Sequence, residues 1–295
     1  MSSFPPDNEI VNDFFLAWPT NLTPRSADVD SKRFSILSLG FDSNFTQGDF
    51  ADWALYMRQT WWVPIVVALV YCELVFVGQK YMRDRKPMDL KLALCIWNSI
   101  LAIFSIMCSL KIVPYFVYTF LFSGPAYFIT RIGTMSYGQG GEVSFWCFAF
   151  VMSKYVELID TAFLVLRKKP VALLHWYHHA TVLVLSIQSM AVLGPTGVVM
   201  AAMNSLVHSV MYTYYAIAAV ARPPRWGKIV TRLQIAQMIA GTVMGVAVFG
   251  VPYFVPHSYG VLANNAMIVG IYVSYLVLFA QFYSRRYQIE KAKSV

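Results

Sequence analysis

Seven long apolar stretches constrain this chain more than any other feature of its sequence. A helix needs roughly 20 mostly apolar residues to cross the hydrocarbon core of a bilayer. The segments that meet this length are 61–80, 90–120, 143–166, 172–191, 197–220, 229–250 and 261–283. Only 13% of the 295 residues are charged, against about 25% in soluble domains. The sequence therefore predicts an all-α, polytopic membrane protein with seven transmembrane helices.

Helix-breaking signals occur at two places, one inside a segment and one between two segments. The second segment contains Lys111 and Pro114, so we expect that helix to bend or to end early there. The third and fourth segments are separated only by Arg167–Pro170. A basic turn closed by proline is typical of one helix ending and another beginning, so we keep these two segments as separate spans.

The positive charge of the chain gathers on one side of the segments. Sixteen of the 23 Lys and Arg residues lie at or beyond the ends of the first, third, fifth and seventh segments, whereas the loops after the second, fourth and sixth hold only Arg131. Cytosolic loops are rich in Lys and Arg, so we expect a cytosolic C-terminus and an N-terminus in the lumen or outside the cell. The net charge of +8 then marks a membrane face, and a nucleic-acid partner is not expected.

The two ends of the chain differ from the seven-span region, which we place at 60–284. Residues 1–59 form a polar tail, predicted to be luminal, with a glycosylation sequon at Asn44. This tail has no apolar run of signal-peptide length, so the first span is expected to direct insertion. Residues 285–295 form a basic cytosolic tail in which Lys291 and Lys293 have the spacing of a dilysine retrieval signal. We therefore predict the endoplasmic reticulum membrane.

Ionisable residues occur inside the third segment, where they are costly. A charge at the bilayer centre costs about 2.5–3.5 kcal/mol on insertion scales, so such residues face the interior of a bundle. Lys154, Glu157 and Asp160 follow one another at i, i+3 steps and share one helical stripe. One interpretation is an ion network that only fixes packing. We favour a functional site, because three charges are more than packing requires.

Histidines gather in the next two segments. His175, His178 and His179 are spaced i, i+3 and i+4, which places three imidazoles on one helical face. The fifth histidine, His257, stands in a predicted loop and is interpreted as structural. The fifth and sixth segments add polar and soft side chains at helical spacing: Asn204, His208, Met211, Tyr212, Tyr215, Gln234 and Gln237.

Several functions fit such a cluster. The histidines resemble one box of the membrane desaturases and hydroxylases, but those di-iron enzymes need more histidines than the five present here. A single zinc with three imidazoles would strain the turn, because adjacent side chains diverge by about 100° on a helix. Metal-free acyl transfer needs only a neutral imidazole, and the usual histidine pKa near 6.5 supplies one that can attack a thioester. A seven-span receptor or transporter is a further alternative.

Four ordered motifs make the chain similar to a known family. They read Lys154-x-x-Glu157-x-x-Asp160-Thr161, His175-x-x-His178-His179, Asn204-x-x-x-His208-x-x-Met211-Tyr212-x-Tyr214-Tyr215 and Thr231-x-x-Gln234-x-x-Gln237. In this order and spacing they resemble the ELO family of very-long-chain fatty acid elongases, the 3-ketoacyl-CoA synthases of the endoplasmic reticulum. Tyr275-Leu276-Val277-Leu278-Phe279 in the last span is also similar. The resemblance runs from about residue 60 to the C-terminus.

The resemblance implies an acyltransferase that condenses malonyl-CoA with an acyl-CoA, releases CoA and carbon dioxide, and lengthens the chain by two carbons. It implies that spans two to seven form an inverted barrel around an acyl tunnel with CoA at its cytosolic mouth. His178 and His208 match the histidines of acyl chemistry, while His175, His179 and Asn204 would support them. The substrate-binding residues that we assign are Lys154, Glu157, Asp160, Arg167, Lys169, Tyr214, Lys228, Thr231 and Gln234.

The resemblance also implies the partners and two departures from the family pattern. Acyl-CoA and malonyl-CoA are the expected substrates, and no cofactor or metal is expected. The expected partners are membrane lipid and the other enzymes of the elongation cycle. A homo-oligomer is left open. Some members carry a cysteine in the luminal loop after span two, but residues 134–142 have none, so we expect no disulfide. Pro170 stands where members acting on polyunsaturated chains often have glutamine, and we therefore expect saturated or monounsaturated substrates.

Overall fold

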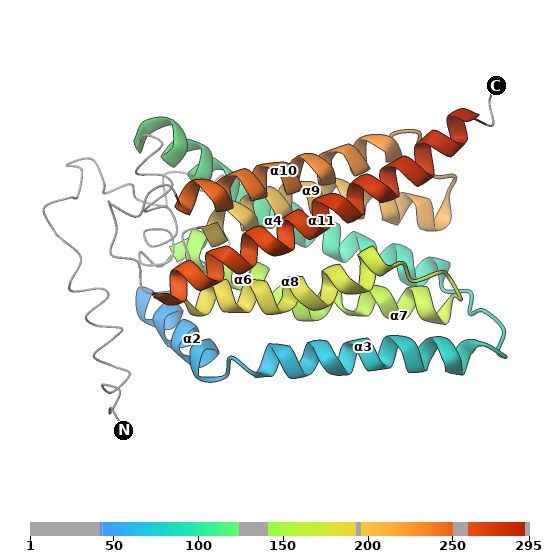
Figure 1. Ribbon diagram of the computed structural model, residues 1–295, viewed down its shortest axis with the longest axis horizontal. Helices are drawn as coiled ribbons and strands as arrows, with labels where there is room; N and C mark the ends of the chain where they lie inside the picture. Colours follow the sequence, from blue (N-terminus) through green and yellow to red (C-terminus); the bar gives the residue numbers. More distant parts are fainter. Residues whose placement is uncertain (1–41, 43, 124–140, 193–195, 250–258, 293–295) are drawn as a thin grey trace, which may run out of the picture.

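The computed structural model describes residue 42 and residues 44–123, 141–192, 196–249 and 259–292. Within these ranges the chain is helical and has no strand (Figure 1), which confirms the all-α prediction. The helices are α2 (Gln47–Gln59), α3 (Val63–Met82), α4 (Lys91–Ser123), α6 (Gly141–Glu157), α7 (Ile159–Leu166), α8 (Leu173–Ala191), α9 (Thr196–Val220), α10 (Gly227–Phe249) and α11 (Tyr259–Ala292).

A helix occupies each of the seven predicted segments, and the third is divided into α6 and α7 at Leu158. Among the described residues, the stretches that are long and apolar enough to cross a membrane are Val63–Met82, Lys91–Tyr118, Gly227–Phe249 and Ala263–Arg286. Helices α8 and α9 are not among these four stretches. They carry the histidines, and polar side chains of this kind lower the mean hydropathy of a helix. Several apolar helices of this kind indicate a multi-pass membrane protein.

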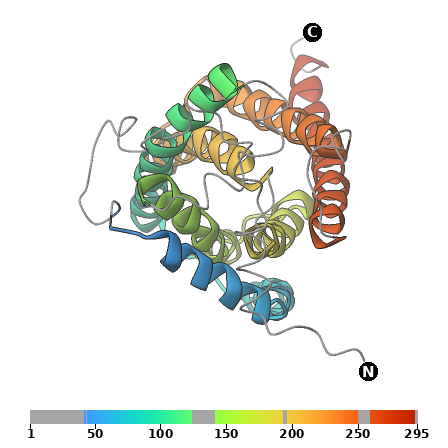
Figure 2. The same ribbon diagram turned by 90° about the vertical axis from the view of Figure 1, so that its left-hand side faces the viewer.

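The contacts between α4, α6, α8, α9, α10 and α11 close into a ring, whose interior can be seen in the end-on view of Figure 2. Passing around it, α4 contacts α9, α9 contacts α10, α10 contacts α11, α11 contacts α8, α8 contacts α6, and α6 returns to α4. The first long apolar helix, α3, lies outside this ring against α7 and α8. This is the arrangement expected for spans two to seven, with the first span as an addition to the barrel.

One end of the ring is closed by a packed cluster, to which α2 contributes. The helix α2 begins at a capping box in which Asp49 N donates to Thr46 Oγ1 and Asp49 Oδ2 accepts from Thr46 N. Its buried face reaches the cluster through Phe50 and Met57. This helix lies in the region that the sequence analysis treated as a polar tail, and its contacts with α6 and α8 make it part of the folded bundle.

A buried ion cluster lies in the same packed end. Lys111 Nζ is 2.8 Å from Glu142 Oε2 and 3.2 Å from Asp42 Oδ2, and Trp146 Nε1 donates to Asp42 Oδ2 at 3.0 Å. Because the charge of Lys111 is compensated, it does not interrupt the helix. Of the two expected outcomes at this place, a bend or an early end, the early end is wrong, since α4 continues through Pro114 to Ser123.

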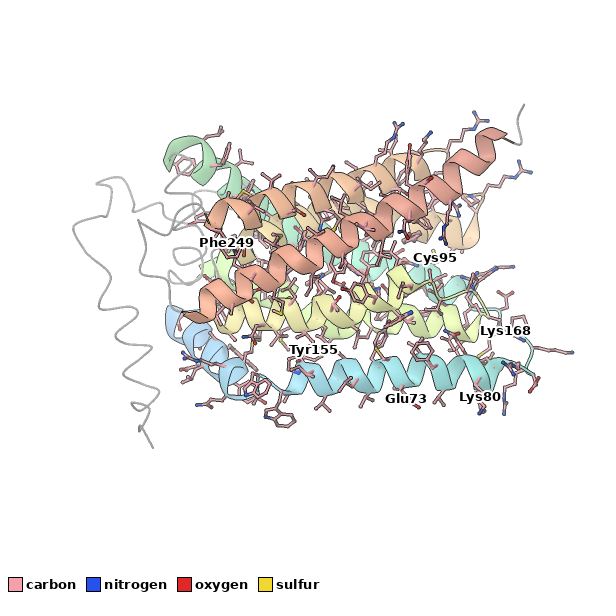
Figure 3. All side chains as sticks on the ribbon, viewed as in Figure 1. Glu73, Lys80, Cys95, Tyr155, Lys168 and Phe249 are labelled. Atoms are coloured by element: carbon pink, nitrogen blue, oxygen red, sulfur yellow. The ribbon has the colours of Figure 1, made fainter. Side chains whose placement is uncertain are left out.

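The opposite end of the ring carries the basic loops. Figure 3 shows Lys80 and Lys168 at the end away from α2. Lys168 has a left-handed backbone conformation, with φ 53°, and its Nζ donates to the carbonyl oxygens of Arg83 and Arg85 at 2.7 and 3.1 Å. The turn between α7 and α8 is therefore tied to the turn between α3 and α4.

Candidate active site

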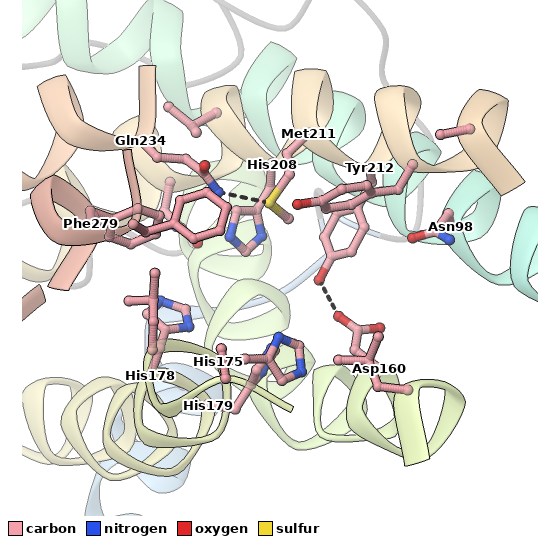
Figure 4. A pocket seen from close by; sticks show the side chains of 18 of the residues that line it. Asn98, Asp160, His175, His178, His179, His208, Met211, Tyr212, Gln234 and Phe279 are labelled. Carbon is pink, nitrogen blue, oxygen red and sulfur yellow. Dashed lines mark hydrogen bonds between the residues drawn. The ribbon is translucent and has the colours of Figure 1, made fainter. Parts of the chain in front are cut away.

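A cavity of about 420 Å³ lies inside the ring, and α4, α7, α8, α9, α10 and α11 all contribute side chains to its lining. Figure 4 shows the polar groups that face it. The polar residues of the lining are Asn98, Asp160, Arg167, His175, His178, His179, Asn204, His208, Tyr212, Tyr215, Gln234 and Gln237. The side chains that the sequence placed on separate helices are thus brought together around one space.

The three histidines of α8 line this cavity from one turn of helix. Their ring centroids are 4.5 Å apart for His175 and His179 and 5.4 Å apart for His178 and His179. His175 Nε2 is 2.9 Å from Thr161 Oγ1, which fixes its ring against α7. His178 lies instead beside Tyr275 of α11, with ring centroids 4.9 Å apart. The rings are therefore turned to different partners, as the divergence of adjacent helical side chains requires.

His208 reaches the same cavity from α9, on the wall that faces the histidines of α8 (Figure 4). The side chains of His178 and His208 both line the cavity, and neither is turned toward lipid. Within the described residues, no group of three or more His, Cys, Asp or Glu side chains is placed to hold a metal ion. The arrangement presents imidazoles on two sides of a space that a small reacting group can enter.

An ion pair lies behind this wall and contacts it through an amide. Lys154 Nζ is 2.6 Å from Glu157 Oε1 and donates to Asn204 Oδ1 at 3.1 Å. Neither Lys154 nor Glu157 is in the cavity lining, whereas Asn204 and His208 are. His208 Nδ1 lies 3.9 Å from Glu157 Oε1. Because Lys154 occupies the oxygen of Asn204, the amide N–H group is the donor that Asn204 retains for a molecule in the cavity.

Asp160 belongs to a different network from Lys154, although the sequence placed both on one stripe. Its Oδ1 accepts from Trp97 Nε1 at 2.5 Å, and its Oδ2 accepts from Tyr212 OH at 2.8 Å. The break at Leu158 between α6 and α7 separates the two networks. Trp97 was not among the predicted site residues, although one signal existed in the sequence: an indole N–H in an apolar helix needs an acceptor.

The remaining assigned residues divide into those at the cavity and those outside its lining. Arg167 and Gln234 line it, and Gln234 Nε2 contacts Met211 Sδ at 3.2 Å. Four of these remaining side chains do not line the cavity. Lys169 is exposed, and Thr231 is buried with its hydroxyl 3.4 Å from Gly227 O. The ring centroids of Tyr214 and Trp226 are 5.1 Å apart, and Lys228 Nζ lies 5.8 Å from the ring centre of Tyr283. His257 lies outside the described residues.

A second cavity of about 50 Å³ adjoins the first, and four residues line both: His178, Asn204, Gln237 and Met238. The small cavity continues past His178 along α8 and ends against Phe150 and Val151, which belong to the packed cluster. The two cavities together describe a passage that starts among the polar residues and narrows toward the closed end of the ring. His178 stands at the junction.

Comparison with known proteins identifies the family of this chain. The family model described as ELO: GNS1/SUR4 family matches residues 56–295. The chain is 37% identical over 251 residues to a Caenorhabditis elegans protein named "Putative fatty acid elongase 3", covering 84% of this chain and 77% of that protein. It is 36% identical to mouse "Very long chain fatty acid elongase 3", covering 83% of this chain and 89% of that protein, and 33% identical to mouse "Very long chain fatty acid elongase 6", covering 85% and 94%. The chain belongs to the ELO family.

Proposed function

We propose that this chain is a fatty acid elongase that condenses malonyl-CoA with a long-chain acyl-CoA to give 3-ketoacyl-CoA, CoA and carbon dioxide. Its membership of the ELO family and the names of its relatives support elongation. The observation that carries the condensation step is the single cavity lined by His178 and His208 from facing helices. That cavity continues into a narrower passage with room for part of an acyl chain.

The first half of the reaction is transfer of the acyl group to His178. The neutral imidazole attacks the thioester carbonyl, a C–N bond forms, the C–S bond breaks, and CoA leaves as the thiol after taking up the imidazole proton. The oxygen of the carbonyl becomes negative during the attack, and the amide N–H of Asn204 and the ring of His208 are the donors that line the same space. His175 and His179 hold the turn of α8 that presents His178.

The second half uses malonyl-CoA. Loss of carbon dioxide leaves its bonding electrons on the adjacent carbon, and this enolate attacks the acyl-imidazole carbonyl. A new C–C bond forms, the C–N bond breaks, and the departing imidazolate of His178 takes up a proton from water, which restores the neutral imidazole. A preorganised donor that stabilises the enolate oxygen lowers the barrier to carbon dioxide loss, and we assign this role to His208, which faces His178 across the cavity.

The CoA part of the substrates is assigned to the end of the ring that carries the basic loops. Arg167 lines the cavity at the end of α7, and a guanidinium binds phosphate through paired hydrogen bonds. We place Lys169, Lys228, Tyr214 and Thr231 around this entrance and Asp160, Lys154, Glu157 and Gln234 farther in. The accepted chains are saturated or monounsaturated, and no cofactor is consumed.

The proposal includes a place in the cell. The basic loops lie in the cytosol, where CoA substrates are available, the N-terminus is luminal, and the protein resides in the endoplasmic reticulum membrane through its dilysine tail. The partners are membrane lipid and the other enzymes of the elongation cycle. Asn44, which is exposed just before α2, is then on the luminal side.

The test is an elongation assay in microsomes that contain the full chain. We expect radiolabelled malonyl-CoA to be incorporated into 3-ketoacyl-CoA with a panel of saturated and monounsaturated acyl-CoA substrates, in the presence of a metal chelator. Microsomes that contain His178→Ala at the same protein level serve as the control. No incorporation with any acyl length, or activity that a chelator abolishes and iron or zinc restores, would overturn the proposal.

A further inference from the structure

The cavity beyond His178 is the smaller of the two cavities that form the passage. Its volume of about 50 Å³ holds only a few water-sized groups. On α8 it is lined at successive turns by Val182, Ser186 and Ser189. Ser189 is 11 residues beyond His178, which corresponds to about 16 Å along a helix. A small displacement of any side chain in this wall therefore changes how far a chain can extend.

One side chain in that wall is held back by a glycine. Tyr272 of α11 lines the small cavity and is 6% exposed. Its ring rests directly on Gly241 of α10: a Cβ at Gly241 would fall within 3.0 Å of ring atoms Cε1 and Cδ1 and 3.2 Å from Cζ. Such an approach is closer than real Cβ atoms make. The ring of Tyr272 therefore occupies the space that a side chain at position 241 would need.

The two helices have little freedom to separate and relieve such a clash. One turn farther along α10, Asn265 Nδ2 donates to Gly245 O at 2.7 Å. A Cβ at Gly245 would lie 2.8 Å from Val269 Cγ2. Because α10 and α11 are close at both glycines, the open space beside the ring of Tyr272 is the cavity itself. Because Tyr272 lines the small cavity, we expect a ring that is pushed off α10 to move into the passage.

We propose that the contact between Gly241 and Tyr272 sets the depth of the passage and so the longest acyl chain that the protein accepts. Gly241 keeps the ring against α10, and the ring forms part of the side wall of the small cavity that a long chain must pass. This inference rests on the proposed elongase function and adds a residue pair that determines substrate length. The polar groups around His178 are the same for every chain length, whereas this wall distinguishes long chains from shorter ones.

The first experiment compares Gly241→Ala with Gly270→Ala. A Cβ at Gly270 meets nothing within 4 Å, so this variant controls for adding a methyl group to the same helix pair. Microsomes with each variant receive labelled malonyl-CoA and an acyl-CoA series that increases by two carbons. We expect Gly241→Ala to reduce kcat/KM for the longest accepted chain by about tenfold or more, to retain activity on shorter chains, and to shift the product limit downward. Gly270→Ala should match the wild type.

Removing the ring should have the opposite effect. Tyr272→Ala is expected to raise the product limit by at least one two-carbon step, and in the double variant Gly241→Ala, Tyr272→Ala the downward shift should disappear. Tyr272→Phe keeps the bulk of the ring but removes the hydroxyl, and should retain the wild-type limit. If Tyr272→Phe moves the limit as far as Tyr272→Ala, the hydroxyl and not the bulk of the ring is responsible, and the proposal is wrong.

A measurement on the unaltered chain covers the case in which these variants fold poorly. Acyl-CoA probes with a diazirine at the terminal carbon are crosslinked in microsomes, and the labelled peptides are identified. We expect the longest accepted probe to label the peptide that contains Tyr272 and shorter probes to label residues nearer His178. Wild-type activity with the same product limit in Gly241→Ala and Gly270→Ala, or no length-dependent label near Tyr272, would overturn the depth proposal alone. Absence of elongation by the wild type would overturn the proposed function itself.

Discussion

Two buried lysines occupy the two halves of the ring and differ in what surrounds them. Lys111 pairs with Glu142 and Asp42 in the packed end, where Phe50 and Met57 of α2 and residues of the ring helices close the interior. Lys154 pairs with Glu157 at 2.6 Å but also donates to Asn204, which lines the main cavity. Both ammonium groups are almost fully buried, with side chains 1% exposed.

Because only one of the two lysines contacts a residue of the main cavity, we expect Lys111 to affect stability alone and Lys154 to affect activity as well. A buried ion pair is weak support for stability by itself, but removing one partner leaves an uncompensated charge. At Lys111 we expect the consequence to be confined to packing, since Glu142 and Asp42 line neither of the two cavities described above. At Lys154 the same chemistry orients an amide beside His208. The first pair holds the closed end of the ring together, and the second positions groups at the open space.

The largest effect should come from comparing two residues of α8, one in each half. His178→Ala removes the proposed attacking group, and we expect elongation to fall by about 10³-fold or more with little change in the thermal unfolding temperature. Ile187 belongs to the packed cluster, so Ile187→Ala should destabilise by about 2–5 kcal/mol while the folded fraction keeps its activity. Activity per folded molecule and unfolding in detergent measure both. Similar loss of activity in the two variants would contradict the division of the ring.

The two lysines provide the next comparison. Lys111→Met and Lys154→Met should each cost about 3–5 kcal/mol of stability, because a carboxylate is left buried without its partner. Adding Glu157→Gln to Lys154→Met should recover part of that stability but none of the activity, since Asn204 is still unsupported. Lys111→Met should keep normal turnover in the folded fraction. Unfolding and single-turnover acylation measure the two quantities separately, and normal acylation by Lys154→Met would show that its ion pair is only structural.

A smaller effect is expected from the carboxylate at the cavity edge. Trp97→Phe removes the indole N–H that donates to Asp160 and also replaces the indole by a smaller ring, so a control for packing is needed. A hydrogen bond to a charged group contributes about 1.5–3 kcal/mol. We expect elongation to fall by about tenfold. Phe163 packs against this indole, with ring centroids 6.0 Å apart, and Phe163→Leu is the control for packing. Equal losses in the two variants would assign Trp97 to packing.

Three consecutive basic residues in the turn after α7 differ in their surroundings and allow a further comparison. Arg167 lines the cavity, Lys168 is bound to two backbone carbonyl groups, and Lys169 is exposed. Arg167→Gln should raise KM for acyl-CoA by about tenfold, as expected for loss of a charged hydrogen bond to phosphate, with a smaller change in kcat. Lys169→Gln should change KM less, because its side chain is solvated. Equal effects from the two substitutions would place CoA over the outer turn instead.

The smallest effect is expected at α2. Thr46→Ala removes a capping box, which costs about 1 kcal/mol and should loosen α2 without altering turnover. Hydrogen exchange of residues 47–59 measures this directly. Thr60 at the other end of α2 is the matched control, since Thr60→Ala leaves the N-terminal cap intact. A clear loss of elongation in Thr46→Ala would mean that the packed end takes part in catalysis.

The comparison also shows which features the sequence could predict. The seven helical segments and the histidine turn on α8 follow from local patterns, because apolar length and the i, i+3, i+4 spacing act within one helix. The division between Lys154 and Asp160 did not follow, since it depends on a break at Leu158 that no local signal marks. The helix α2 was also missed, because its apolar face is short and only packing against α6 and α8 reveals it. The order of helices around the ring depends on contacts between distant segments.

The most direct test of the account is whether His178 becomes acylated. The purified chain is incubated with a long-chain acyl-CoA in the absence of malonyl-CoA, digested, and examined by mass spectrometry. We expect an acyl adduct on the peptide from α8 that maps to His178, disappears when malonyl-CoA is added, and is absent from His178→Ala. Full turnover by a chain whose His178 is never modified under these conditions would contradict this expectation.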